Sequence, residues 1–291
     1  MIKMANIIIT APVRIDISGG WPDSDPYRKD FGGAVLNAAI NLRVFGMSAE
    51  KTVTTSLQNV PKGSGLGASG AIRAIYLALS NPSLIEDERA KLDLIKRVHL
   101  FENKVLSQRA GFQDEAASIF GGVNYWEFSK SGEVERREID KSQADHLEKR
   151  LVIVYTGEGH LSPNIHDLVF GEGVYSGNIP RLNRMKGIAY EMTRNVTDEQ
   201  AMGELIGETW TLQKQLHLSI ETDTMRNLQE RLSGKYLAAR ATGAGGGGCM
   251  IFYTQHKENL IEEVNALKKE IKGVRVIPFN FDYSGIRVKD N

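Results

Sequence analysis

Cysteine, long apolar runs and a leader sequence are scarce or missing in this chain of 291 residues. It has one cysteine, Cys249, so no disulfide can form within the chain, and a reducing, cytoplasmic setting fits that count. No stretch reaches the ~18 uninterrupted apolar residues of a membrane-spanning helix. Residues 1–6 run directly into strand-like sequence, without the apolar core of a signal peptide. We therefore expect a soluble protein without a membrane partner.

An excess of charge of either sign is also missing. Lys and Arg together number 36, Asp and Glu together also number 36, and the formal net charge is zero. Proteins that wrap nucleic acid usually carry a basic excess or a basic stripe. The densest basic pair, Arg136-Arg137, is flanked on both sides by glutamate, which is typical of a solvated surface. The composition thus predicts no nucleic-acid partner.

The chain has enough apolar residues, 41%, to build two modest folded domains. Residues 130–149 are charged and poorly patterned, whereas the apolar run 151–155 is typical of a buried strand. We place the boundary between these segments, so the predicted domains are residues 1–148 and 149–291. The strand and helix patterns predict strands at 6–18 (two short ones), 43–57, 123–128, 151–155, 236–241, 249–253 and 274–281, and helices at 71–79, 86–106, 114–119, 180–232 and 257–271. This mixture indicates the α+β class.

A glycine-rich segment, PKGSGLGASG at residues 61–70, precedes the predicted helix 71–79. Glycines let the backbone approach a ligand closely, and the free amides at a helix N-terminus favour phosphate. The hydroxyls of Ser64 and Ser69 offer a hydrogen-bond donor and a hard oxygen ligand for Mg²⁺. The segment therefore predicts a phosphate-binding loop, with a flexible connection capped by serine as the alternative.

Two other functions use the same residues. Residues 65–70 match the dinucleotide-binding fingerprint G-x-G-x-x-G, and residues 67–71 approximate the G-x-S-x-G elbow of hydrolases. Both motifs should follow a strand directly, but Pro61, Lys62 and a further glycine precede this loop. The acidic residue that the fingerprint needs about 20 positions later begins a predicted helix instead of ending a strand. The context disfavours both functions.

Two carboxylates follow the loop. Glu102 lies on the apolar face of the predicted helix 86–106, where a carboxylate is costly unless it pairs with a cation or a metal. Asp114 lies in the turn GFQDE, which begins another helix. The pattern alone leaves Glu102 as a metal ligand or a salt-bridge partner. It leaves Asp114 as a catalytic group or a helix cap.

A second glycine loop, TGAGGGG at residues 242–248, joins two predicted strands. It has five glycines in six positions, which is more than a hairpin turn needs. This excess indicates backbone that approaches a ligand or another loop, and a floppy connection is the alternative.

Together these segments resemble the GHMP kinases, a family that includes galactokinase, homoserine kinase and mevalonate kinase. Residues 61–69 match its ATP phosphate loop, P-x-x-x-G-L-G-[SA]-S, and residues 243–248 match its G-[AS]-G-x-G-G loop. Residues 11–23, APVRIDISGGWPD, resemble the sugar-kinase version of its first motif. The phosphate loop departs from many relatives in having GAS in place of two serines, which gives Ser64 more of the work. The third motif carries an additional glycine.

Further segments narrow the resemblance to L-fucokinase and the D-glycero-D-manno-heptose phosphate kinases. They are residues 19–27 (GGWPDSDPY), 32–40 (GGAVLNAAI), 111–115 (GFQDE) and 120–124 (FGGVN). The resemblance implies an α+β fold of two domains. The N-terminal domain would be ribosomal-protein-S5-like, the C-terminal domain ferredoxin-like, and the active site would lie in the cleft.

The resemblance also implies site residues. Asp114 would be the base and Arg14 would lie near the transferred phosphoryl group. Ser69 and Glu102 would bind Mg²⁺. The residues assigned to ATP are Pro61, Gly63, Ser64, Gly65, Leu66, Gly67, Ala68 and Ser69, and those assigned to the substrate are Asp16, Gly20, Trp21, Asp23, Asn37, Gly243, Ala244, Gly245 and Gly246. Independently of the resemblance, the carboxylates of Asp16 and Asp23 suit a polyol, although turn formation also explains such residues.

The predicted function is transfer of the γ-phosphoryl group of ATP, with Mg²⁺, to a sugar or sugar-phosphate hydroxyl. The expected position is the anomeric hydroxyl of an L-fucose-like or heptose acceptor. A heptose phosphate would need cations at its far end, for which Arg28, Lys29 and His166 are candidates. The alternatives are a GHMP kinase that acts on homoserine or a mevalonate-like acid, and a nucleotide-binding regulator without catalytic activity.

Overall fold

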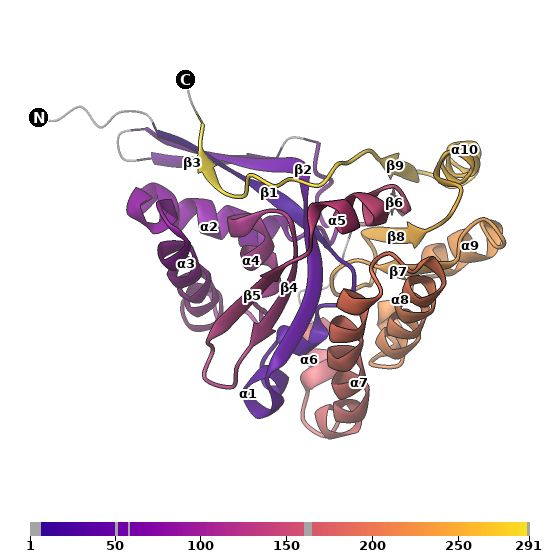
Figure 1. The fold of residues 1–291 in the computed structure, drawn as a ribbon, viewed down its shortest axis with the longest axis horizontal. Helices are drawn as coiled ribbons and strands as arrows, with labels where there is room; N and C mark the ends of the chain where they lie inside the picture. Colours follow the sequence, from indigo (N-terminus) through magenta and orange to yellow (C-terminus); the bar gives the residue numbers. More distant parts are fainter. Residues whose placement is uncertain (1–6, 50–51, 58, 160–164, 290–291) are drawn as a thin grey trace, which may run out of the picture.

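Two antiparallel sheets with packed helices make up the computed structural model, which describes residues 7–49, 52–57, 59–159 and 165–289 (Figure 1). The leader-sequence prediction falls on residues 1–6, outside these ranges. The α+β class predicted from the sequence is confirmed. No helix of the described part of the chain is both long and apolar enough to cross a membrane.

The first sheet has the strand order β10-β1-β2-β4-β5, and β3 pairs with β2. Its strands are β1 (Ile7–Asp16), β2 (Gly33–Ala49), β3 (Thr52–Leu57), β4 (Val123–Phe128), β5 (Val134–Glu138) and β10 (Arg287–Val288). The register between β1 and β2 shifts between Pro12 and Val13. This irregularity accommodates Pro12, which has no amide hydrogen to give to the ladder. β1 is therefore one continuous strand, and the predicted pair of short strands is wrong.

Helices α2 (Ala68–Ser80) and α4 (Gln113–Phe120) pack against this sheet and on each other, and α3 (Glu88–Leu100) packs on both helices (Figure 1). The small residues Ala71 and Ala74 allow α2 to lie close to β1, and both are fully buried. The predicted helix 86–106 changes its hydrogen bonding after Leu100, where a single π-helical turn, η3 (Phe101–Val105), follows. Such turns are frequent at functional sites, and this one carries Glu102.

The second sheet has the strand order β7-β8-β6-β9. Its strands are β6 (Leu151–Tyr155), β7 (Ala238–Ala241), β8 (Cys249–Tyr253) and β9 (Arg275–Ile277). β6 and β8 have the bounds that the sequence predicts, and every residue of both strands is buried. Its helices are α7 (Tyr175–Arg194), α8 (Glu199–Lys214), α9 (Asp223–Arg231) and α10 (Lys257–Leu267). The short elements of the chain are η1 (Trp21–Asp23), α1 (Tyr27–Phe31), η2 (Pro82–Ile85), α5 (Lys141–Glu148), α6 (Ile165–Phe170) and η4 (Leu218–Ile220).

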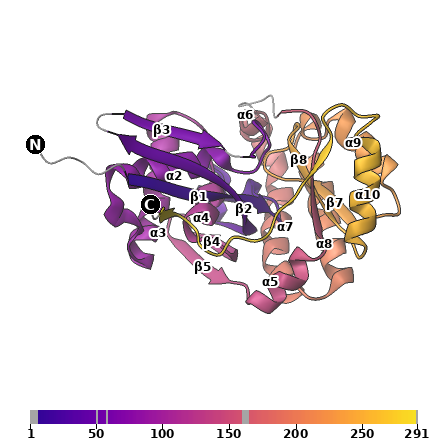
Figure 2. The same cartoon turned by 90° about the horizontal axis from the view of Figure 1, so that it is seen from above.

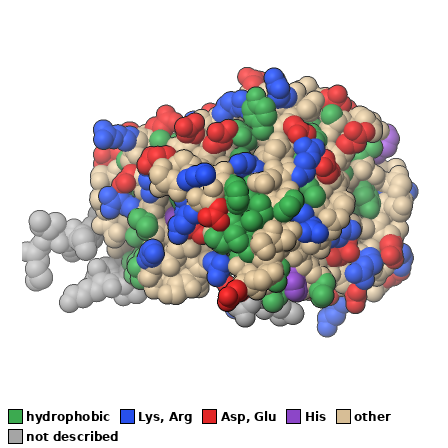
Figure 3. All heavy atoms as spheres, turned by 90° about the horizontal axis from the view of Figure 1, so that it is seen from below, with side chains coloured by type: hydrophobic (Ala, Val, Ile, Leu, Met, Phe, Trp, Pro, Cys, Tyr) green, Lys and Arg blue, Asp and Glu red, His purple; other side chains and the backbone are tan. Residues whose placement is uncertain are grey.

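The two sheets are connected by packing as well as by the chain. α7 packs on β2 and β4 of the first sheet and on α8 beside the second. Figure 2 shows the C-terminal segment running back to the first sheet, where β10 pairs with β1. The charged segment 130–149 is also ordered, as β5 and α5, because Val134, Ala144 and Leu147 bury their side chains. On the face seen in Figure 3, basic and acidic side chains are interspersed.

Candidate active site

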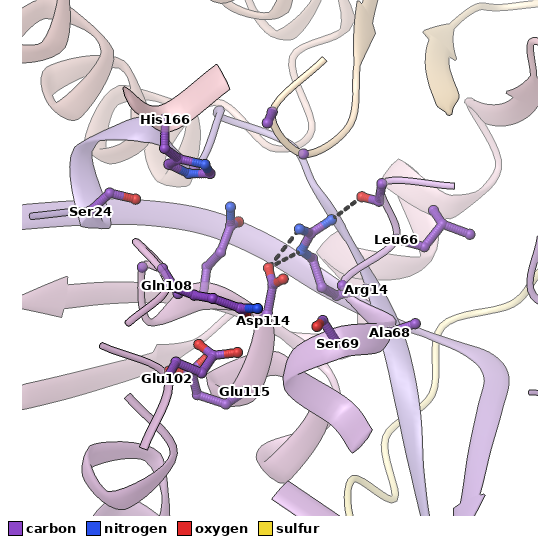
Figure 4. A pocket seen from close by; sticks show the side chains of 18 of the residues that line it. Arg14, Ser24, Leu66, Ala68, Ser69, Glu102, Gln108, Asp114, Glu115 and His166 are labelled. Atoms are coloured by element: carbon purple, nitrogen blue, oxygen red, sulfur yellow. Dashed lines mark hydrogen bonds and ion pairs between the residues drawn. The ribbon is translucent and has the colours of Figure 1, made fainter. Parts of the chain in front are cut away.

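A cavity of about 640 Å³ opens where the N-termini of α2 and α4 meet the second glycine loop (Figure 4). Most of the predicted site residues line it. These are Arg14, Gly20, Trp21, Asp23, Pro61, Gly63, Ser64, Gly65, Leu66, Gly67, Ala68, Ser69, Glu102, Asp114, Gly243 and Ala244. The predicted phosphate loop, metal ligands and base therefore share one hollow.

The phosphate loop is held against the strands of both sheets. The amide of Arg14 donates to the Leu66 carbonyl at 2.9 Å, and the amide of Cys249 donates to the Ser64 carbonyl at 2.8 Å. Gly67 caps α2 with φ of 72°, and a Cβ atom there would lie 2.9 Å from Cγ of Arg14. The position thus requires glycine. The first turn of α2 has no acidic residue, so its free amides offer an anion site.

Arg14 and Asp114 form an ion pair at the floor of the cavity (Figure 4). Nε and Nη2 of Arg14 both donate to Oδ1 of Asp114, at 2.8 and 2.6 Å, and Nη1 donates to the Gly65 carbonyl at 2.5 Å. Burial opposes the charge of Arg14, but Asp114 and then Asp16 raise its pKa overall. Oδ2 of Asp114 accepts no hydrogen bond from the described residues, and its side chain is 30% exposed. This oxygen can therefore accept a proton from a ligand in the cavity.

The predicted metal ligands Ser69 and Glu102 face each other across a cation. Nη1 of Arg73 lies 2.6 Å from Oε1 of Glu102 and also donates to the Ser69 hydroxyl. Nη2 of Arg73 donates to Oε1 of Gln108 at 2.5 Å. Burial raises the pKa of Glu102 to about 7, although Arg73 lowers it. A hydroxyl and a carboxylate are hard oxygen donors, and a cation already lies between them, so these residues fit Mg²⁺.

Two further acids lie beside Asp114. Oδ2 of Asp23 accepts the amides of Phe112 and Gln113 at 2.7 and 2.8 Å, so this carboxylate holds the first turn of α4. Burial raises the pKa of Asp23 to about 7, although these amides lower it. Glu115 lines the cavity, is fully buried and has a pKa that burial raises well above its usual value. Asp23 therefore has a structural task besides any contact with substrate.

The second glycine loop packs mostly on protein. Gly243 and Ala244 line the cavity, and the backbone of Gly243 lies against that of Gly65 in the phosphate loop. Gly245 and Gly246 do not line it. The Gly246 amide donates to the Ile220 carbonyl at 2.8 Å, and a Cβ at Gly245 would lie 2.7 Å from the same oxygen. The prediction that these two glycines contact substrate is not supported, because the loop is glycine-rich to pack against η4 and other backbone.

Asp16 and Asn37, both predicted to bind substrate, lie outside the cavity and are fully buried. Oδ2 of Asp16 pairs with Arg240 at 3.1 Å. Burial would raise the pKa of Asp16, but the charges of Arg240 and Arg14 lower it to about 2. Asn37 donates to the Gln113 carbonyl and accepts from Nε1 of Trp126. Both side chains are used up by protein partners, so their assignment to substrate is corrected to a structural one.

The other end of the cavity is lined by Trp21, Gln113 and His166. The rings of Trp21 and His166 lie 4.9 Å apart. Nε1 of Trp21 and Oε1 of Gln113 are buried and have no hydrogen-bond partner among the described residues. A donor and an acceptor are thus left for a polar ligand.

Of the three residues proposed as cations for a sugar phosphate, one lines the cavity and two do not. His166 lines the cavity, whereas Arg28 and Lys29 do not, and both pair with Asp25, at 2.6 and 3.0 Å. Arg109, which the sequence analysis missed, lines the cavity and pairs with Asp167 at 2.9 Å.

Comparison with known proteins adds to this geometry. Residues 34–122 match the GHMP kinases N terminal domain, and residues 189–273 match the GHMP kinases C terminal domain. The first match contains helices α2 to α4 of the cavity, and the second match contains the second glycine loop.

The relatives that match most of this chain share a low sequence identity with it. The chain is 26% identical to the D-glycero-alpha-D-manno-heptose 7-phosphate kinase of Campylobacter jejuni, over 98% of this chain and 99% of that protein. It is 23% identical to the bifunctional fucokinase/GDP-fucose pyrophosphorylase of Arabidopsis thaliana, over 87% of this chain but only 30% of that protein. The fold resembles the crystal structure of a D-glycero-D-manno-heptose 1-phosphate kinase from Bacteriodes thetaiotaomicron, with a TM-score of 0.73, 20% identity and coverage of 98% and 99%.

Proposed function

Because the chain belongs to the GHMP kinase family, we propose that it is an ATP-dependent kinase that phosphorylates a sugar or sugar-phosphate hydroxyl. The observation that carries this proposal is the Arg14–Asp114 pair beside the free N-terminus of α2, in a single cavity. A phosphate site and a proton acceptor are the two parts that phosphoryl transfer needs. The heptose kinase and fucokinase relatives are both named as sugar kinases, which supports a sugar as the acceptor.

In the proposed reaction the acceptor oxygen attacks the γ-phosphorus while the bond from that phosphorus to the bridging oxygen breaks, and ADP leaves. The hydroxyl proton passes to Oδ2 of Asp114, the oxygen that Arg14 does not use. Arg14 fixes the orientation of Asp114 and places positive charge near the transferred group. The amides of the first turn of α2 hold the phosphates of ATP. Catalysis in this site would rest on positioning and charge.

We also propose that Ser69 and Glu102 hold Mg²⁺, since they are hard oxygen donors that already share the guanidinium of Arg73. When bound, the ion would neutralise charge on the β- and γ-phosphates. Glu102 and Ser69 would then exchange one cation for another, so Arg73 would become free to contact phosphate.

The proposed acceptor position is the anomeric hydroxyl. The unpartnered donor of Trp21 and acceptor of Gln113 support a polyol, since both can bond hydroxyl groups. Arg109 lies at the same cavity, paired with Asp167, so a cation is available there for a phosphorylated sugar. A non-sugar acceptor, such as homoserine or mevalonate, would leave more of these polar groups without a partner.

A coupled assay of ADP release against free and phosphorylated sugars, homoserine and mevalonate tests this proposal. We expect turnover with a sugar, and phosphorus NMR of the product should show a phosphate coupled to the anomeric proton. Coupling to another proton would overturn the anomeric assignment. Turnover confined to homoserine or mevalonate would overturn the sugar, and no turnover with any acceptor would support a regulator.

The division into residues 1–148 and 149–291 remains our proposal for the domains. Each part contains one of the two matched family segments and one sheet, apart from β10, which returns to the first sheet.

A further inference from the structure

Four carboxyl groups gather at the floor of the cavity, and two guanidinium groups face them. The acids are Asp23, Glu102, Asp114 and Glu115, and the charges of Asp23 and Asp114 act on both glutamates. Arg14 pairs with Asp114 and Arg73 with Glu102. Among the described residues, two of the four acids, Asp23 and Glu115, therefore have no arginine partner.

Among these acids only Glu115 lacks a partner in the described part of the chain. Asp23 is bonded to two amides, and the other two have arginines. Neither Oε1 nor Oε2 of Glu115 accepts a hydrogen bond of normal geometry from another described residue, although its own amide faces the carboxyl group. A buried carboxyl group without partners is costly, and an ion is one of the ligands that can satisfy it.

Figure 4 shows the carboxyl group of Glu115 beside that of Glu102, and both lie below Asp114 in this view. Both glutamates line the cavity, and after burial the charge of Glu102 is the largest cause of the raised pKa of Glu115. The two glutamates come from η3 and α4, so two separate elements position them.

We propose that Glu115 is a further metal ligand, which with Glu102 and the Ser69 hydroxyl binds one divalent cation of the Mg²⁺ type together with ATP phosphates. This inference rests on the proposed function. Mg²⁺ in nucleotide sites is held by one or two carboxylates plus phosphate oxygens, and Glu115 supplies the second carboxylate. Arg73 now lies between Ser69 and Glu102, and no ion pair or hydrogen bond joins it to Glu115. Its guanidinium must therefore move aside when the cation binds, which a side chain 15% exposed at the cavity can do.

The test uses Mn²⁺ as the probe, with a non-hydrolysable ATP analogue and the full chain. Calorimetry gives the affinity for the analogue with and without Mn²⁺, and electron paramagnetic resonance reports free and bound Mn²⁺. For Glu115→Gln we expect the gain in analogue affinity that Mn²⁺ provides to fall at least about tenfold, as in Glu102→Gln. The affinity for the analogue without metal is measured for each variant, so that the gain from Mn²⁺ is taken relative to that variant's own metal-free value. Glu133→Gln, which removes an exposed carboxylate paired with Lys96, is the control for net charge and should behave as wild type.

Thermal unfolding without metal separates a ligand from a structural acid. Glu115→Gln should be at least as stable as the wild type, because it removes a buried acid without a partner, whereas Glu102→Gln loses its ion pair with Arg73. If Glu115→Gln does not fold, Glu115→Asp is measured in the same way, and we expect a several-fold loss of the gain from Mn²⁺.

Each outcome has a distinct meaning. Mn²⁺ could raise the analogue affinity of Glu115→Gln or Glu115→Asp as much as that of the wild type, and raise that of Glu102→Gln less. That result would overturn the role of Glu115 and leave the proposed function standing. No gain from Mn²⁺ in the wild-type protein would overturn both.

Discussion

Two arginine–carboxylate pairs share the end of β1, yet one lies at the cavity and the other supports it. Arg14 and Asp16 are two positions apart on one strand, so both side chains leave the same face of the sheet. Arg14 pairs with Asp114, whose side chain is 30% exposed. Asp16 pairs with Arg240, and both side chains are fully buried.

The oxygens of the two carboxylates show why the pairs differ. Oδ1 of Asp16 accepts the Thr242 hydroxyl and the Gly243 amide, and Oδ2 accepts the Gly20 amide and Arg240. Asp114 receives both bonds from Arg14 on one oxygen. A carboxylate with four protein partners can only support structure, whereas one with a spare oxygen can do chemistry.

The largest expected effect is on stability, in the pair that is fully buried. Asp16→Asn leaves Arg240 as a buried charge without its counter-ion, so we expect a loss of about 3–5 kcal/mol in the free energy of unfolding. Urea unfolding followed by tryptophan fluorescence measures it, with Asp145→Asn on the exposed side of α5 as control. A stability close to wild type, together with a large rise in KM for the sugar, would return Asp16 to the substrate site.

The next effect is on turnover, in the pair at the cavity. Asp114→Asn removes the proton acceptor, so kcat should fall at least ~10²-fold, while affinity for ATP changes little. Steady-state kinetics and a nucleotide-binding titration measure the two parts. Near-full turnover would show that Asp114 is a helix cap. Asp114 would then be a structural residue, as Asp16 is.

A smaller effect, on the dependence of activity on Mg²⁺, is expected at Glu102, which pairs with Arg73. Glu102→Gln should raise the Mg²⁺ concentration for half-maximal activity by about tenfold. The melting temperature without nucleotide should fall only slightly. Titration of activity with Mg²⁺ and melting curves of the same sample provide the comparison. The reverse pattern, clear destabilisation with unchanged metal dependence, would place Glu102 with Asp16 as a structural partner.

The smallest effect is expected at the surface. Arg184 joins α7 to α8 through Glu208, and both side chains are about 40% exposed. Glu208→Gln should therefore change the free energy of unfolding by less than about 1 kcal/mol and leave kcat unchanged. Urea unfolding and kinetics check both. A loss as large as that of Asp16→Asn would show that burial is not what separates these pairs.

The sequence could predict the groups that come from short motifs. Arg14, Ser69, Glu102 and Asp114 each lie in a local pattern, and the structure brings all four to one cavity. The α+β class followed from the alternating patterns in the same way. The local pattern left the roles of Glu102 and Asp114 open, and the resemblance to the GHMP kinases was needed to assign them and Arg14.

The sequence could not separate supporting acids and amides from those at the cavity. Asp16 and Asn37 look like polar ligands, but their partners Arg240 and Trp126 lie far along the chain. Arg73 was missed although it lies four residues after Ser69 on α2, a spacing that places two side chains on one helix face. That spacing was the available signal for a cation beside the predicted metal site.

The return of the C-terminal segment makes the two halves depend on each other for folding. Without β10, β1 would be an unpaired outer strand, with free amides and carbonyls that invite association. The returning segment is also tied to the first connection between the halves, since Glu148 in α5 accepts hydrogen bonds from Asn280 and Phe281. Cutting the chain at residue 148 would therefore leave the first fragment with an unpaired strand edge at β1 that is prone to association. The second fragment would carry β10 without the strand with which it pairs.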